Sequence, residues 1–93
     1  MAQLLSDSQI REKLNTLSGW TTEGPKLVCT RTFQDFIQAI DFVNKLVEPA
    51  ESAGHHPDIE ISYNRVKINL TTHDAGGLTQ KDVDLAQVIS QIS

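Results

Sequence analysis

The clearest hydrophobic pattern of the chain lies in its second half. Apolar and polar residues alternate over residues 59–63 and again over 66–70, with a turn sequence at 64–65 between them. A period of two is typical of strands that bury one face. The pattern therefore predicts an antiparallel hairpin in which Tyr63 faces Val66, and this pairing sets the register of both strands.

Helical spacing and capping residues predict the remaining elements. In two places a Ser or Thr stands three residues ahead of a Gln or Asp, which resembles a capping box before a helix with an apolar stripe. The predicted elements are, in chain order, a helix over 7–17 capped by Ser6, a short hairpin of 20–22 and 27–32, a helix from Phe33 to Gly54 that kinks or restarts at Pro49, the hairpin of 59–63 and 66–70, and a last helix opened by Thr79 and Asp82.

The order α-β-β-α-β-β-α indicates an α+β fold. Two hairpins separated by helices favour a four-stranded antiparallel sheet with the helices packed on its apolar face. We expect the 93 residues to form one domain spanning positions 1–93.

The helix that begins at Phe33 has more apolar surface than one sheet face requires. Its apolar positions cover an arc of roughly 220°, whereas packing on a sheet needs an arc only somewhat above 100°. We expect the surplus around Phe42 and Leu46 to contact another copy, so the sequence predicts a homo-oligomer.

Composition excludes several classes of partner. The net charge is −4, the isoelectric point is near 5.1, and the sequence has no basic run, so we expect no direct contact with nucleic acid. No apolar run is long enough for a membrane helix, and the N-terminus lacks a signal-peptide pattern. The single Cys29 excludes an intramolecular disulfide and suits a reducing compartment. We expect a cytoplasmic protein without membrane contact.

The histidines are the main candidates for chemistry, because all three lie between positions 55 and 73. The predicted register places His56 opposite His73, with Cβ atoms roughly 4.5 to 5.5 Å apart. We expect His55 to lie beside these two imidazoles and Glu51 to lie within reach of them. Imidazole titrates near pH 6.5, so such a cluster can hold a proton donor and an acceptor together. We therefore favour an acid/base site over three unrelated surface histidines.

Other chemistries fit the sequence less well. Zinc bound by the histidines with Glu51 or Asp82 is the main rival, but adjacent histidines diverge in an extended chain and no known ligand spacing occurs. Cys29 is interpreted as a small buried hydrophobe rather than a nucleophile. Trp20 belongs to the core or an interface, or lines a ligand pocket. Lys81 and Asp82 are by default a solvated first helical turn.

The spacing of these residues resembles the pterin-4a-carbinolamine dehydratases. The shared pattern is an acidic residue, His-His-Pro, an aromatic, a further His and an Asp, and the likeness runs from the Gly19-Trp20 segment to the final helix. In this chain the pattern consists of Glu51, His55, His56, Pro57, Tyr63, His73 and Asp82. The resemblance implies removal of water from a 4a-hydroxytetrahydropterin, giving the quinonoid dihydropterin for tetrahydropterin recycling, with no metal or organic cofactor.

The resemblance also implies roles for individual residues. His55 and His73 would be general acids toward the 4a-hydroxyl, and His56 would bind the pterin and take the N5 proton. Glu51 would tune this network. The candidate substrate-binding residues are His56, Thr72, Lys81, Asp82 and Trp20.

Two positions depart from the pattern of many relatives. Gly54 stands where they have an acidic residue, and Lys81 stands where they have an Arg, so the bidentate fork of a guanidinium is lost. Family members are tetramers formed through helix packing and sheet edges. Some relatives are binding proteins instead, either a transcription cofactor or RuBisCO assembly factors, so a non-catalytic binding or assembly role is the alternative. Retention of all three histidines favours the enzyme without excluding a protein partner.

Overall fold

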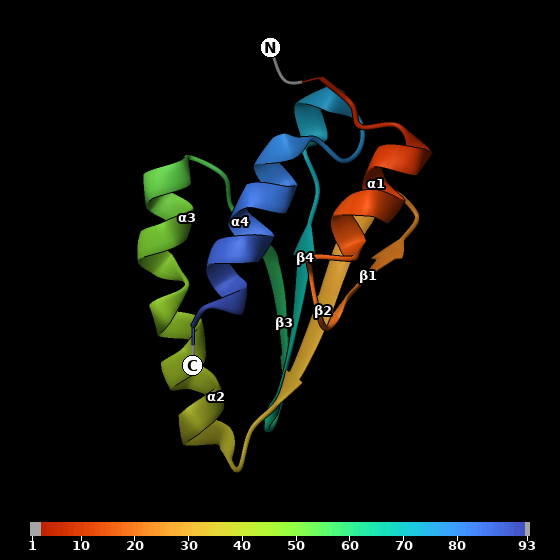
Figure 1. Ribbon diagram of the computed structural model, residues 1–93. Coiled ribbons are helices and arrows are strands. Elements are labelled where there is room, and N and C mark those ends of the chain that lie inside the picture. The colour runs from red at the N-terminus through yellow and green to blue at the C-terminus, as the bar shows by residue number, and fades with distance from the viewer. Residues whose placement is uncertain (1–2, 93) are drawn as a thin grey trace.

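A computed structural model describes residues 3–92 and contains the predicted sequence of elements (Figure 1). The elements are α1 (Asp7–Leu14), β1 (Trp20–Glu23), β2 (Lys26–Thr32), α2 (Phe36–Lys45), α3 (Val47–Ala53), β3 (Asp58–Ser62), β4 (Arg65–Leu70), the 3₁₀ helix η1 (His73–Ala75) and α4 (Gln80–Ser90). The order agrees with the predicted α-β-β-α-β-β-α arrangement, with α2 and α3 together occupying the place of the predicted second helix.

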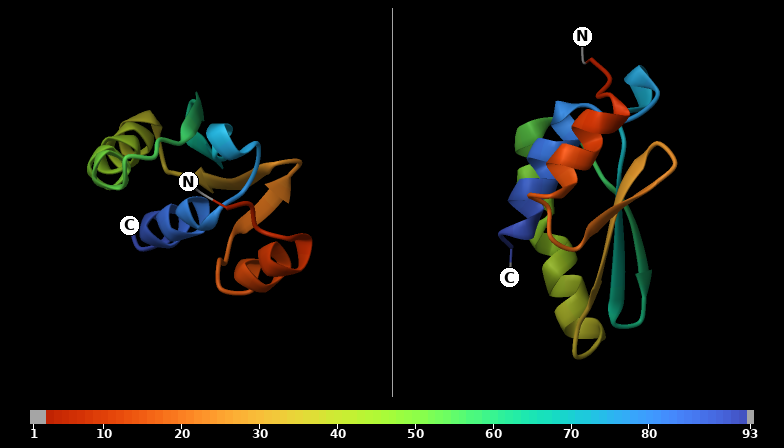
Figure 2. Two further views of the ribbon diagram at one scale, coloured as in Figure 1. Left: turned by 90° about the horizontal axis from the view of Figure 1, so that it is seen from above. Right: turned by 45° about the vertical axis from the view of Figure 1, so that its right-hand side comes forward.

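The four strands form one antiparallel sheet in the order β1-β2-β4-β3. The helices lie together on one side of this sheet and leave the other side open (Figure 2). The predicted α+β class is confirmed. Within residues 3–92, no helix has the length and apolar character needed to cross a bilayer.

The predicted second helix breaks into two at Leu46. Asp35 caps α2 by accepting a hydrogen bond from the Gln38 amide, and Leu46 ends it. Pro49 then lies in the first turn of α3, where a missing N–H leaves no helical hydrogen bond unmade. Of the two predicted outcomes at Pro49, the helix therefore restarts rather than kinks.

The core lies between the helices and the sheet, and it includes two residues that the sequence had suggested for an interface. Phe42 and Leu46 are each only 2% exposed, because they pack into the core of their own chain. The prediction that they form the surplus apolar surface is wrong. The large apolar side chains exposed on α2 and α3 are Phe36, Ile37 and Val47.

The hairpin of β3 and β4 forms with a register different from the predicted one. Ser62 pairs with Arg65, so the turn lies at 63–64, and Val66 faces Ile61 rather than Tyr63. The predicted pairing is therefore wrong, and so is the derived position of His56 opposite His73.

Contacts with Phe33 explain where this turn lies. Its amide donates to the Asn64 carbonyl over 2.7 Å, and the Asn64 side chain donates back to the Phe33 carbonyl over 2.9 Å. These two bonds hold Asn64 in the turn, and Tyr63 beside it adopts φ +51°, which a bulky residue seldom does. A distant segment thus selects the register.

Arg31 secures the far end of α4. Its guanidinium donates to the carbonyls of Ile92 and Ile89 over 2.6 and 3.1 Å, and it lies 4.7 Å from the centre of the Phe42 ring. A cation at a helix C-terminus is favourable because it faces the unpaired carbonyls. Strand β2 therefore holds the last turn of α4.

Candidate functional site

The end of α3 directs the two adjacent histidines. Gly54 adopts φ +61°, the left-handed conformation that ends many helices, and its amide donates to the Glu51 carbonyl. The His55 amide donates to the Ala50 carbonyl over 3.1 Å, completing a Schellman motif. The chain therefore leaves α3 sharply and carries His55 toward α4.

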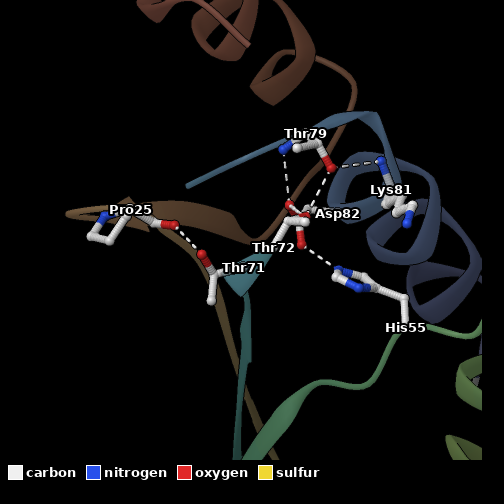
Figure 3. A network of polar contacts seen from close by, with 7 residues as sticks. All are labelled: Pro25, His55, Thr71, Thr72, Thr79, Lys81 and Asp82. Carbon is white, nitrogen blue, oxygen red and sulfur yellow. Dashed lines mark hydrogen bonds and ion pairs between the residues drawn. The ribbon is translucent and has the colours of Figure 1, made fainter. Parts of the chain in front are cut away.

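His55 forms a buried pair with Asp82. Its Nε2 lies 2.6 Å from Oδ1 of Asp82, and the two side chains are 11% and 0% exposed (Figure 3). Asp82 is in the first turn of α4, where the helix dipole favours a negative charge. The pair joins α3 to α4 across 27 positions of the chain.

The second carboxylate oxygen of Asp82 accepts two further hydrogen bonds. Oδ2 accepts the Thr79 amide over 2.9 Å and the Thr72 hydroxyl over 2.7 Å. The predicted capping pair of Thr79 and Asp82 is confirmed, because Thr79 caps α4 and Asp82 completes the capping box. The expectation that Asp82 belongs to a solvated turn is wrong, since the side chain is buried.

His56 makes a different pair, on the surface. Its Nε2 lies 2.5 Å from Oε2 of Glu51, and the side chains are 61% and 69% exposed. Glu51 is in the last turn of α3, so it does lie within reach of a histidine as expected. The pair borders a shallow, mostly apolar groove of about 250 Å³ between the helices and β3, lined by Val43, Leu46, Val47, Ala50, Glu51, His56, Pro57 and Ile59.

His73 begins η1 and is exposed. It follows Thr72, whose hydroxyl contacts Asp82 and whose backbone pairs with Gly77 across an isolated bridge. His73 is thus linked to His55 through Asp82 and Thr72, although within residues 3–92 the His73 side chain makes no hydrogen bond or ion pair. The structure therefore resolves the expected cluster into a buried pair, an exposed pair and a free imidazole.

The remaining candidates lie at various distances from these pairs. Trp20 is 5% exposed in the core, and its ring N–H donates to the Ser90 hydroxyl over 2.9 Å. Ser90 is about 12 Å along α4 from Asp82 at a rise of 1.5 Å per residue, so the polar atom of Trp20 serves the core. Lys81 is exposed and borders a groove of about 440 Å³ between α3 and α4.

Thr72 is a buried part of the Asp82 network. It is 6% exposed, and its hydroxyl also lies 2.8 Å from the Thr79 hydroxyl. This link between two threonines seven positions apart has no signal in the sequence beyond the Thr79 cap, because it depends on how β4 meets α4.

The side-chain arrangement also bears on metal binding and on the reactivity of Cys29. Among the residues that the structure describes, no three His, Cys, Asp or Glu side chains are close enough to share a metal ion. Cys29 is buried, as expected, and burial raises the pKa of its thiol while the nearby Arg31 opposes the shift. A raised pKa keeps the thiol neutral and unreactive near pH 7.

Known proteins match the chain over nearly its full length. A sequence model of the family "Pterin 4 alpha carbinolamine dehydratase" matches residues 3–92. A protein of Nostoc sp. (strain PCC 7120), named "Putative pterin-4-alpha-carbinolamine dehydratase", is 74% identical over 93 residues, which is 100% of each chain.

Two solved structures share the fold. The transcriptional coactivator/pterin dehydratase from Brucella melitensis has a TM-score of 0.90 at 31% identity, covering 95% of this chain and 96% of its own. A pterin dehydratase-like protein identified as a RuBisCO assembly factor in the alpha-carboxysome has a TM-score of 0.56 at 21% identity, covering 80% of this chain and 89% of its own. The second likeness concerns the fold alone.

Proposed function

The chain belongs to the pterin 4 alpha carbinolamine dehydratase family, and we propose that it removes water from a 4a-hydroxytetrahydropterin to give the quinonoid dihydropterin. The observation that carries this proposal is the His55–Asp82 pair, in which a nearly buried imidazole is held against a fully buried carboxylate. An imidazolium beside a carboxylate is stabilised and oriented, so it can deliver a proton at a defined point.

The proposed reaction needs one proton donor and one acceptor. Protonated His55 gives its proton to the 4a-hydroxyl, the C4a–O bond breaks, and the hydroxyl leaves as water. The N5–H bond breaks as its electron pair forms the C4a=N5 double bond, and neutral His56 takes the N5 proton. Glu51 lies beside His56 and stabilises the imidazolium that forms.

His73 is the second proposed acid. Its exposed imidazole starts the turn that follows Thr72, so it is attached to the same network as His55 while remaining free to meet a ligand. Acid/base assistance of this kind contributes roughly 10² to 10⁴ in rate, or about 3 to 5 kcal/mol of barrier. That range suits a carbinolamine, which already loses water slowly without a catalyst.

A stopped-flow assay tests the proposal. We expect the purified protein to accelerate dehydration of 4a-hydroxytetrahydropterin, and His55→Ala or His73→Ala to lower kcat by roughly 10² or more. We propose that His55 and His73 serve opposite faces of the pterin ring, so each loss should be greatest for one of the two 4a-epimers. Circular dichroism would check that the variants fold. Equal rates for the wild type and a variant with all three histidines changed to Ala would refute the enzymatic function.

A binding or assembly role is the second candidate. It is favoured by the apolar side chains of Phe36, Ile37 and Val47, which are 50%, 70% and 59% exposed on adjacent helices. A patch of this kind suits contact with protein. An adaptor would keep its partner when the three histidines are replaced, whereas the dehydratase would lose its activity.

We propose that these side chains first serve contact between copies of this chain. Strands β1 and β3 are the edges of the sheet, and their unpaired backbone groups offer a second surface for assembly. We further propose that the dehydratase works in the cytoplasm, in tetrahydropterin recycling.

A further inference from the structure

The hydroxyl groups around Asp82 can be assigned as donors or acceptors by counting hydrogens. A threonine hydroxyl has one hydrogen to donate. Thr72 donates its hydrogen to Oδ2 of Asp82 over 2.7 Å, so the 2.8 Å contact between the two threonine hydroxyls requires Thr79 to be the donor. Thr79 in turn accepts the Lys81 amide over 3.3 Å. The bonds therefore run in one direction, from Lys81 through Thr79 and Thr72 to Asp82 (Figure 3).

This direction makes Oδ2 of Asp82 an acceptor only. It receives the Thr72 hydroxyl and also the Thr79 amide, and a backbone amide can only donate. An ionised carboxylate has no hydrogen of its own to donate. A charged Asp82 accepts at Oδ1 as well, so the hydrogen in the 2.6 Å contact belongs to Nε2 of His55.

We propose that Thr72 is a positioning residue that holds His55 in the Nε2–H tautomer, so that His55 presents Nδ1 to its substrate. Resting on the proposed function, this names the nitrogen that carries the proton to the 4a-hydroxyl. It also changes the expected role of Thr72. At 6% exposure and with its hydrogen used on Asp82, Thr72 acts through His55 and not by touching the pterin.

The neighbouring Thr71 provides a matched control. Its hydroxyl donates to the Pro25 carbonyl over 2.7 Å, and so ties the same segment to the loop between β1 and β2. Thr71→Val therefore removes a threonine hydroxyl bond of the same length without touching Asp82. Thr72→Val and Thr72→Ser complete the set, since valine has the shape of threonine without the hydroxyl and serine restores the hydroxyl.

The tautomer is read by long-range ¹H–¹⁵N NMR of the imidazole rings in the whole protein at a pH where His55 is neutral. We expect wild-type His55 to show one tautomer with its hydrogen on Nε2. Thr72→Val should give a mixture of tautomers and lower kcat about tenfold, with KM changed by less than about twofold. Thr72→Ser and Thr71→Val should keep both the single tautomer and kcat.

Three results would overturn the proposal. The first is a wild-type His55 with its hydrogen on Nδ1. This result comes from the wild-type protein alone, so it does not depend on whether any variant folds. The second is a Thr72→Val protein with unchanged tautomer and kcat, and the third is a Thr71→Val protein that loses as much as Thr72→Val. A wild type inert toward the pterin would overturn the proposed function alone, and the tautomers would still decide the role of Thr72.

Discussion

His55 and His56 are neighbours in the chain, yet they meet their carboxylates under opposite conditions. The His55–Asp82 pair is almost excluded from water, and every oxygen of its carboxylate has a partner. The His56–Glu51 pair is mostly exposed and rests on a single contact. Removing one partner from a buried pair costs about 3 to 5 kcal/mol, whereas an exposed pair contributes about 0 to 1 kcal/mol.

The difference teaches how one short segment can provide two kinds of acid/base group. Gly54 ends α3, and the extended chain that follows turns one imidazole inward and leaves the next at the surface. The inner imidazole has a fixed orientation, which suits delivery of a proton to one atom. The outer one can adjust to a ligand in the apolar groove beside it.

The largest expected effect comes from removing the buried carboxylate. Asp82→Ala leaves the Thr72 hydroxyl and the Thr79 amide without their acceptor, so it should lower the free energy of unfolding by about 3 kcal/mol or more. Glu51→Ala should change it by less than about 1 kcal/mol. Urea unfolding followed by circular dichroism measures both values.

Asp84→Ala is the control for this comparison. Asp84 is exposed on the same helix, and among residues 3–92 it accepts a hydrogen bond only from the Gln80 side chain, so its loss should have a small effect. Similar losses for Asp82→Ala and Glu51→Ala would show that the two pairs do not differ as described.

An intermediate effect on stability is expected at Gly54, which ends α3 between Glu51 and the two histidines. Gly54 has φ +61°, and no other atom would crowd an added Cβ, so Gly54→Ala tests backbone strain alone. We expect a loss of about 1 kcal/mol in the free energy of unfolding. Gly54→Asn should recover most of it, because Asn tolerates this conformation. Equal stability of the Ala variant and the wild type in thermal and urea unfolding would contradict this account.

The smallest effect on folding is expected on the exposed side of α2. Ile37 is 70% exposed, so Ile37→Glu should change the free energy of unfolding of one chain by less than about 0.5 kcal/mol. It should nevertheless dissociate the proposed oligomer, which sedimentation velocity would detect. Phe42 on the same helix is the contrasting case, because it is 2% exposed in the core and a charge there should unfold the chain.

This last experiment also sharpens the comparison between the pairs. Contact through α2 and α3 would bring a second copy to the side of the molecule where Glu51 and His56 lie, and would make the outer pair less exposed than it is in a single chain. A wild type that sediments as a monomer would leave the contrast as described and contradict the proposed assembly.

Much of the fold could be predicted because its signals are local. The alternation over 59–63 and 66–70 located two strands, and in β4 it identified Val66, Ile68 and Leu70 as buried. Over 59–63 the predicted buried face was wrong, because Ile61 and Tyr63 are 41% and 66% exposed. The Thr79–Asp82 spacing indicated a helix start. Pro49 and Gly54 limit helices through their own backbone geometry. None of these features needs a distant residue.

The register of the β3–β4 hairpin depended on a distant residue. Local reasoning placed the turn at 64–65, whereas the structure places it at 63–64, where Asn64 exchanges two hydrogen bonds with the backbone of Phe33. One residue of displacement at the turn was enough to separate His56 from its predicted partner.

The predicted exposure of Asp82 was wrong for the same reason. Read from its neighbours, Asp82 was only the third residue of a helix, exposed by default. Its burial depends on His55 and Thr72, which come from the end of α3 and the end of β4. The histidines and Glu51 were named as candidates because they are close in sequence, whereas the contacts of Asp82 with His55 and Thr72 could be found only from the fold.

Arg31 adds a mechanical consequence. Its two bonds, to the carbonyl of Ile89 in the last turn of α4 and to that of Ile92 just beyond the helix, lie at the opposite end from Asp82. The helix is therefore held at both ends, which restricts its movement along its axis. Because Asp82 in the first turn of α4 holds His55, the position of His55 depends partly on Arg31 of strand β2 at the other end of that helix. Redesign of that strand, even well away from any imidazole, would therefore shift the point at which His55 is proposed to deliver a proton.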